Sequence, residues 1–133
     1  MTESTNTSWA TNLFAVTIFA EDLAAMREFY ERVFELPCVF GGDTSAIYKF
    51  GETMINILQV DNAPDLIDPA AVAGPDAGAR SMFTINVDDV DAVHASLVAK
   101  GVEFLNGPID RPWGPRTVAF ADPAGHMWEI AQH

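Results

Sequence analysis

The chain has 133 residues, of which 49% are hydrophobic, so it can bury the core of one domain without disulfides or a structural metal. Seven basic residues against nineteen acidic residues give a formal charge of -12, which would repel nucleic-acid phosphates and anionic lipids. We therefore expect neither a nucleic acid nor a membrane as a partner.

Residues 1–12 are polar and are expected to form a flexible tail with neither a basic start nor an apolar signal core. No run of the sequence approaches the ~20 apolar residues that a membrane span requires. The single cysteine, Cys38, cannot form an internal disulfide. Together these features predict a soluble cytoplasmic protein.

Residues 13–60 read as one unit that begins with a strand at 13–20. Asp22 is placed to cap a helix in which apolar residues recur every three or four positions from Leu23 to Phe34, before Pro37 ends it. Three strands are expected to follow, at residues 39–40, 46–50 and 54–60.

Residues 61–80, rich in Asp, Pro, Ala and Gly, show no period and are expected to be a linker with a possible helical turn at 70–73. Residues 81–133 then repeat the first unit. A strand at 82–87 leads to a helix capped by Asp89 and ended by Gly101, and further strands are expected at 102–105, 117–121 and 127–132. The sequence thus predicts a duplicated strand, helix and strand unit within one domain.

The repeat is visible in the residues themselves, because Thr17, Ile18 and Asp22 match Thr84, Ile85 and Asp89 at one constant offset. The acidic turn followed by REFYERVF, and the segment RTVAFADPAGHMWEIAQ near the end, resemble the vicinal oxygen chelate superfamily of glyoxalases, bleomycin-resistance proteins and extradiol dioxygenases. The resemblance covers residues 13–132. It implies an α+β fold of two tandem βαβββ modules that form a curled, cup-shaped sheet, commonly completed across a homodimer, with the ligand in the hollow.

The resemblance also implies where a metal would be held in metal-dependent members, which place His, Glu or Gln at four equivalent strand positions. In this sequence those positions carry Ala15, Asn56, Met82 and Glu129. Alanine offers no donor atom, methionine offers a soft thioether, and the asparagine amide offers only a neutral oxygen. We therefore expect no metal and no cofactor.

Strand alternation assigns the cup-facing side chains, and the expected ligand-binding residues among them are Phe19, Asn56, Met82, Thr84 and Glu129. Five further residues are expected to complete the rim: Tyr48, Phe50, Trp113, Arg116 and Phe120. Trp113 would stack on a planar ligand, and Arg116 would meet Glu129 or an anionic group. Core packing is the alternative for the apolar members, and a structural role is the alternative for Glu129.

Three functions are compatible with this interpretation. The first is metal-independent binding of a small aromatic or cationic molecule in an apolar cup, in the style of antibiotic-sequestering proteins. The second is a metal-independent lyase, isomerase or hydrolase with Glu129 as general acid or base. The third is a metal-dependent lactoylglutathione lyase or extradiol dioxygenase, which the missing ligands disfavour.

Overall fold

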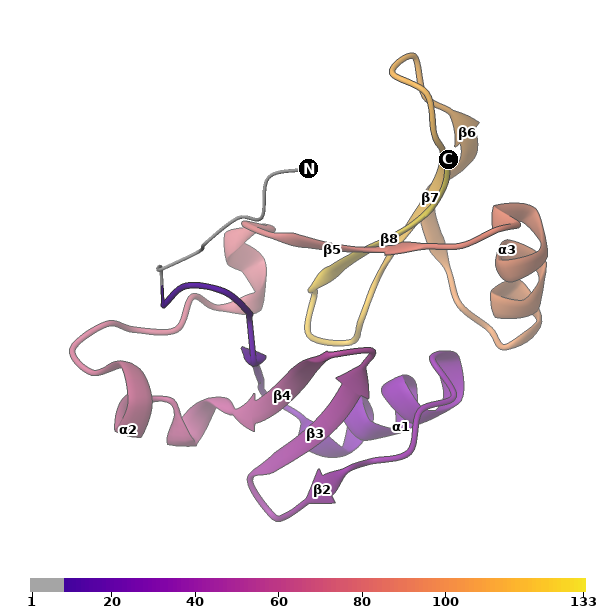
Figure 1. Cartoon of the computed structure of the whole chain (residues 1–133). Helices are drawn as coiled ribbons and strands as arrows, with labels where there is room; N and C mark the ends of the chain where they lie inside the picture. Colours follow the sequence, from indigo (N-terminus) through magenta and orange to yellow (C-terminus); the bar gives the residue numbers. More distant parts are fainter. Residues whose placement is uncertain (1–8) are drawn as a thin grey trace.

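The first half of the chain forms a sheet in which the initial strand pairs with the last one. This computed structural model describes residues 9–133 (Figure 1), so the predicted tail falls largely outside the described residues. β1 (Ala15–Ala20) pairs in parallel with β4 (Thr53–Gln59), and β3 (Ser45–Phe50) and β2 (Phe40–Gly41) extend the sheet in the order β1-β4-β3-β2. The intervening helix is α1 (Leu23–Val33).

The second half repeats this topology. β5 (Met82–Asn86) pairs in parallel with β8 (Met127–Gln132), and the sheet order is β5-β8-β7-β6. Its other elements are α3 (Val90–Ala99), β6 (Phe104–Asp110) and β7 (Arg116–Ala121). The predicted α+β fold of two βαβββ modules is confirmed, as two separate four-stranded sheets.

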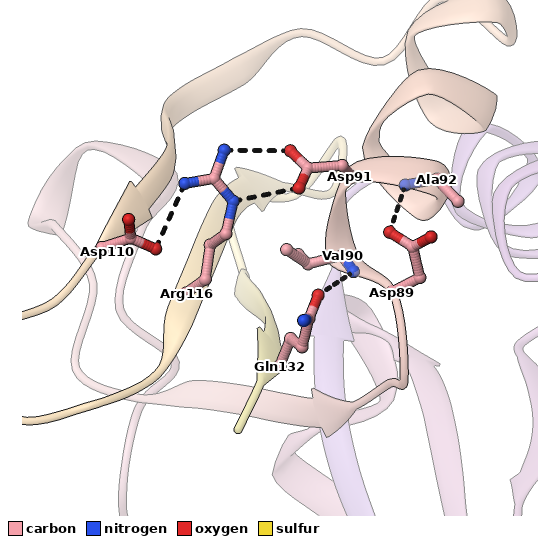
Figure 2. Close-up of polar contacts among 7 residues, drawn as sticks. All are labelled: Asp89, Val90, Asp91, Ala92, Asp110, Arg116 and Gln132. Atoms are coloured by element: carbon pink, nitrogen blue, oxygen red, sulfur yellow. Dashed lines mark hydrogen bonds and ion pairs between the residues drawn. The ribbon is translucent and has the colours of Figure 1, made fainter.

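The residues that recur between the two modules explain why each helix starts where it does. Asp22 accepts a hydrogen bond from the amide of Ala25 at 3.0 Å, and Asp89 accepts one from Ala92 at 3.1 Å. Two glutamines at the ends of the last strands also accept hydrogen bonds from the first residues of these helices. The Gln59 side chain accepts from the Leu23 amide. The Gln132 side chain accepts from the Val90 amide (Figure 2). Each pair satisfies amides that the first turn of a helix leaves unpaired.

One apolar core joins the two modules. The ring of Tyr30 on α1 lies 6.0 Å from that of Trp128 on β8, and Phe29 lies 6.1 Å from Phe120 on β7. Both sheets contribute side chains to this one cluster, and it lies between them. The opposite face of each sheet therefore points outward (Figure 1).

The connection between the modules contains short helical turns in place of a uniform linker. These are η1 (Val60–Asn62), α2 (Pro64–Ile67) and η2 (Pro75–Ala77). The helical turn predicted at 70–73 is wrong, because the turn starts at Pro64 instead. Proline favours the first position of a helix, since its fixed φ suits the helix and its missing N–H is not needed there.

β6 continues well beyond the predicted strand and includes Pro108. The proline is tolerated because β6 is an edge strand and its register with β7 shifts at this point. Gly107 precedes it with φ of 93°, and a Cβ there would collide with the carbonyl oxygen of Thr117. Only glycine fits this close approach of two backbones. Across residues 9–133, no helix has the length and apolarity to cross a membrane.

Candidate functional site

Each outward face carries a polar pair at the same place in the repeat. On the second sheet, Thr84 and Glu129 lie opposite one another in register, and the Thr84 hydroxyl donates to Glu129 Oε1 at 2.9 Å. On the first sheet, Thr17 and Asn56 have the equivalent register, and Asn56 Nδ2 donates to the Thr17 hydroxyl at 3.3 Å. The structure therefore brings these predicted site residues together in two pairs, one for each module.

Glu129 retains capacity for a ligand. Its side chain is partly exposed, and within residues 9–133 Thr84 is the only group that donates a hydrogen bond to it. An ionised carboxylate has about four acceptor sites, so most of them face the open side of the sheet. Met82, which is 51% exposed, and Met127 lie beside it on the same face. The face thus combines one negative charge with soft apolar side chains.

The four positions that would hold a metal do not fit a hard divalent cation. Ala15 and Asn56 come from the first module and Met82 and Glu129 from the second, so any pairing of modules, within or between chains, gives one carboxylate and one amide. The amide is engaged with Thr17, and the carboxylate accepts from Thr84. Among the described residues, no three His, Cys, Asp or Glu side chains cluster in a way that could hold an ion. Such cations need several oxygen or imidazole donors.

Tyr48 and Phe120 do not lie at the rim, so their predicted placement is wrong. Both side chains are fully buried in the core. Tyr48 is in register with Ile55 and Phe120 with Trp128, so each shares the face of a core residue. The Tyr48 hydroxyl donates to Glu31 Oε2 on α1 at 2.7 Å.

Arg116 does not meet Glu129, because it shares a strand face with Val118 and Phe120 and therefore points toward α3. Figure 2 shows its guanidinium bridging Asp91 and Asp110. Nε and Nη2 donate to the two oxygens of Asp91 at 3.0 Å each, and Nη1 lies 3.2 Å from Asp110 Oδ1. These hydrogen bonds lower the pKa of Asp91 below its ordinary value.

Trp113 lies in the loop between β6 and β7 and is 73% exposed. Within the chain its ring contacts the guanidinium of Arg111, which lies 5.8 Å from the ring centroid. The structure does not bring Trp113 to Glu129 within one chain, so its role against a planar ligand remains a prediction.

Two hollows adjoin the outward faces. One, of about 400 Å³, reaches the outward face only at Thr84, and its other walls include Phe34, Phe50 and Ile85, which pack against the shared core. The other, of about 260 Å³, includes Phe19 from the first sheet, part of the connection, and the turn between β7 and β8. Phe19 and Thr84 are the predicted ligand-binding residues that line these hollows.

Sequence reasoning missed a buried polar network around Asp122. The Tyr30 hydroxyl donates to Asp122 Oδ2 at 2.7 Å, and Trp128 Nε1 donates to the same hydroxyl at 3.2 Å. His126 Nδ1 lies 3.1 Å from both carboxylate oxygens. Burial and the adjacent carboxylate raise the pKa of Tyr30 above its ordinary value, so the phenol remains a donor. Tyr30 is separated from Asp122 by 92 positions in the chain and from Trp128 by 98, so no local sequence motif indicates this network.

Comparisons with known proteins agree with this architecture. The model of the Glyoxalase/Bleomycin resistance protein/Dioxygenase superfamily matches residues 12–130, which confirms the resemblance seen in the sequence. The uncharacterized protein YraH of Bacillus subtilis (strain 168) is 28% identical over 123 residues, which are 89% of this chain and 95% of that protein.

Two solved structures show the same fold. A glyoxalase/bleomycin resistance protein/dioxygenase from Nocardioides matches with a TM-score of 0.84 and 22% identity, over 95% of this chain and 85% of its own. A lactoylglutathione lyase from Agrobacterium tumefaciens matches with a TM-score of 0.76 and 22% identity, over 94% of this chain and 96% of its own. At this identity the likeness concerns the fold alone, since one fold hosts unrelated chemistries.

Proposed function

The chain belongs to the Glyoxalase/Bleomycin resistance protein/Dioxygenase superfamily, and we propose that it binds a small aromatic or cationic molecule without a metal, as antibiotic-sequestering proteins do. The observation that carries this proposal is the Thr84–Glu129 pair, which presents one carboxylate among exposed apolar side chains. Small-molecule sites typically combine mostly apolar walls with a few polar groups that orient the ligand.

The chemistry of the face favours a cation with an apolar body. Glu129 supplies a negative charge, and Thr84 orients that carboxylate through its hydroxyl. The neighbouring thioethers of Met82 and Met127 are polarisable and adapt to aromatic rings. The hollow that reaches Thr84 is walled partly by Phe34 and Phe50 and offers space for a ring. The overall charge of -12 would also attract a cation over long range.

A homodimer would complete the site. Because the shared core occupies the space between the sheets, the face bearing Asn56 and the face bearing Glu129 do not meet within one chain. A second copy would bring the two faces together and enclose the ligand between them. Exposed apolar side chains support this proposal, since Leu13, Phe14 and Leu105 are 71%, 74% and 60% exposed in the single chain.

A metal-independent lyase, isomerase or hydrolase is the second candidate. It is favoured by the sparse hydrogen bonding of Glu129, whose free acceptor sites suit it to take a proton from a bound substrate. The carboxylate would act as the base, and Thr84 would hold it in place. A metal-dependent activity is the third candidate, because the side chains at the four family metal positions do not suit a hard divalent cation.

A ligand screen distinguishes these candidates. Purified protein would be heated with planar aromatic cations, quinones and cationic glycopeptides, and each compound that raises the melting temperature would be recovered and analysed by mass spectrometry. Recovery of the unchanged compound supports binding, whereas turnover that is lost in Glu129→Gln supports the enzymatic alternative. If no compound of these classes shifts the melting temperature, the proposed ligand class is wrong.

A further inference from the structure

The turn between β7 and β8 contains a histidine whose ring is fixed by a buried carboxylate. Asp122 is only 4% exposed, and its Oδ1 accepts the amide hydrogens of Ala124 and His126 at 3.0 Å. Its Oδ2 accepts the hydroxyl of Tyr30. His126 Nδ1 lies 3.1 Å from both oxygens, which completes the set of groups around the carboxylate.

This arrangement determines which ring nitrogen is free. The Asp122 carboxylate accepts hydrogen bonds from the Tyr30 hydroxyl and from two backbone amides, and an ionised carboxylate can only accept. Nδ1 of His126 must therefore donate, so the neutral ring carries its hydrogen there. Nε2 is the nitrogen that remains for another partner. It accepts a hydrogen bond when the ring is neutral and donates one when the ring is protonated.

His126 lines the 260 Å³ cavity between the connection and the β7–β8 turn. Arg80 and Ser81 line the same cavity, and Arg80 makes no hydrogen bond or ion pair within residues 9–133. An arginine, a histidine and a serine therefore line a common space. The remaining walls are mainly apolar and include Phe19 and Val72.

We infer that this cavity is a second binding site, separate from the Thr84–Glu129 face, for a small carboxylic acid with an apolar body. The carboxylate of the ligand accepts hydrogen bonds from Arg80 and from protonated His126, whose charge Asp122 balances from the other side of the ring. The apolar body lies against Phe19 and Val72. Glu21 also lines the cavity, and its charge opposes every anionic group of a ligand, so the two basic residues can offset the repulsion of one carboxylate more readily than that of two.

Benzoate is a suitable probe, and uncharged benzamide is its matched control. Nitrogen-15 spectra of the histidine rings in the full chain would be recorded during a benzoate titration. In the protein without benzoate, we expect the signals of the neutral His126 ring to show the hydrogen on Nδ1. Added benzoate should shift these signals until the site is saturated. Benzamide is expected to bind at least about tenfold more weakly than benzoate, because it carries no negative charge and so cannot form the charge-assisted hydrogen bonds.

Arg80→Gln tests the second contact, and Arg111→Gln removes the same unit of charge from the β6–β7 loop, outside the cavity. Both arginines are on loops, but Arg111 donates hydrogen bonds to Thr117 Oγ1 and Asn106 Oδ1, so the fold of each variant is checked by circular dichroism before the titration. Arg80→Gln should lower the affinity for benzoate at least about tenfold, and Arg111→Gln should leave the affinity for benzoate unchanged. The site assignment is overturned if benzoate leaves the His126 signals unmoved, if benzamide binds as tightly, or if the two arginine variants behave alike.

Discussion

Thr84 and Glu129 lie opposite one another on the parallel strands β5 and β8, with the threonine hydroxyl 2.9 Å from the carboxylate. Thr17 and Asn56 have the same relationship on β1 and β4, at 3.3 Å. The two modules therefore repeat the polar pair and differ in its charge. Because the neutral pair occupies the same register with the same kind of hydrogen bond, this geometry does not require the negative charge, which leaves Glu129 available for a ligand.

Replacing Glu129 with glutamine tests whether the negative charge serves ligand binding and not the fold. The Glu129→Gln side chain keeps an acceptor for the Thr84 hydroxyl and removes only the charge, so stability should change by less than about 1 kcal/mol. Affinity for a cationic ligand should fall at least about tenfold. Glu103→Gln, which removes the same charge at another exposed position, is the control. Calorimetric titration of both variants with a cationic ligand from the screen gives the comparison, and equal affinities would remove Glu129 from the site.

Tyr30→Phe should be strongly destabilising. The hydroxyl of Tyr30 is the donor to Asp122 and the acceptor for Trp128 Nε1, so its loss leaves two buried polar groups short of a partner. We expect a loss of about 2–4 kcal/mol in the free energy of unfolding, measured by urea denaturation.

Tyr48→Phe is the matched control, because Tyr48 is equally buried but its hydroxyl donates to Glu31, whose side chain is 42% exposed. Water can replace that partner, so the loss should stay below about 1.5 kcal/mol. Equal costs for the two tyrosines would show that the Asp122 network has no special role in stability.

The register of the first hairpin could have been predicted from the sequence. A two-residue turn at Gly51–Glu52 pairs Phe50 with Thr53 and thereby Tyr48 with Ile55. Because Asn56 is predicted to face the cup, Ile55 and Ile57 alternate onto the helix-covered face, and Tyr48 opposite Ile55 shares that face. The helices, the strands of the repeat, and the polar faces around Asn56 and Glu129 followed from periodicity and internal duplication.

Other features depend on contacts between distant segments and could not be predicted in this way. The partner of Arg116 is Asp91 because β7 presents this arginine toward α3, which requires the register of the whole second sheet. The Asp122 network joins α1 to the β7–β8 turn. The outward orientation of both faces follows from the shared core around Trp128, and no property of either module alone indicates it.

The ion pair between Asp91 and Arg116 should stabilise the fold only while Asp91 is charged. Its pKa in the folded protein lies below the ordinary value of 3.8, chiefly because of the hydrogen bonds from Arg116. The stabilisation is therefore present above that value and is lost as pH falls through the folded pKa.

We accordingly expect Asp91→Asn to be less stable than the natural protein at pH 7, and the difference to shrink progressively as the pH is lowered below 3.8. Because both side chains are accessible to solvent, about 1 M salt should also reduce it. Urea denaturation across this pH range measures the difference, which would be constant with pH if the ion pair contributed nothing.

Dimer formation should depend on the outward face of β5. Met82→Lys places a charge on this face, whereas Val98→Lys places the same charge on α3, at a residue with the same exposed fraction of 51%. We expect Met82→Lys to shift the protein toward monomers and Val98→Lys to leave its assembly unchanged. Light scattering coupled to size-exclusion chromatography reports the mass of each. Monomeric natural protein, or equal behaviour of the two variants, would show that this face is not the interface.

The central claim is that the site binds its ligand without a metal, and the most direct test is the dissociation constant of a ligand from the screen before and after exhaustive chelation. We predict the same dissociation constant in both samples, with no change when zinc, nickel, manganese or iron(II) is added back, because Ala15 and Met82 stand where two hard donors would be needed. Loss of binding on chelation, with recovery on addition of one of these ions, would contradict the claim.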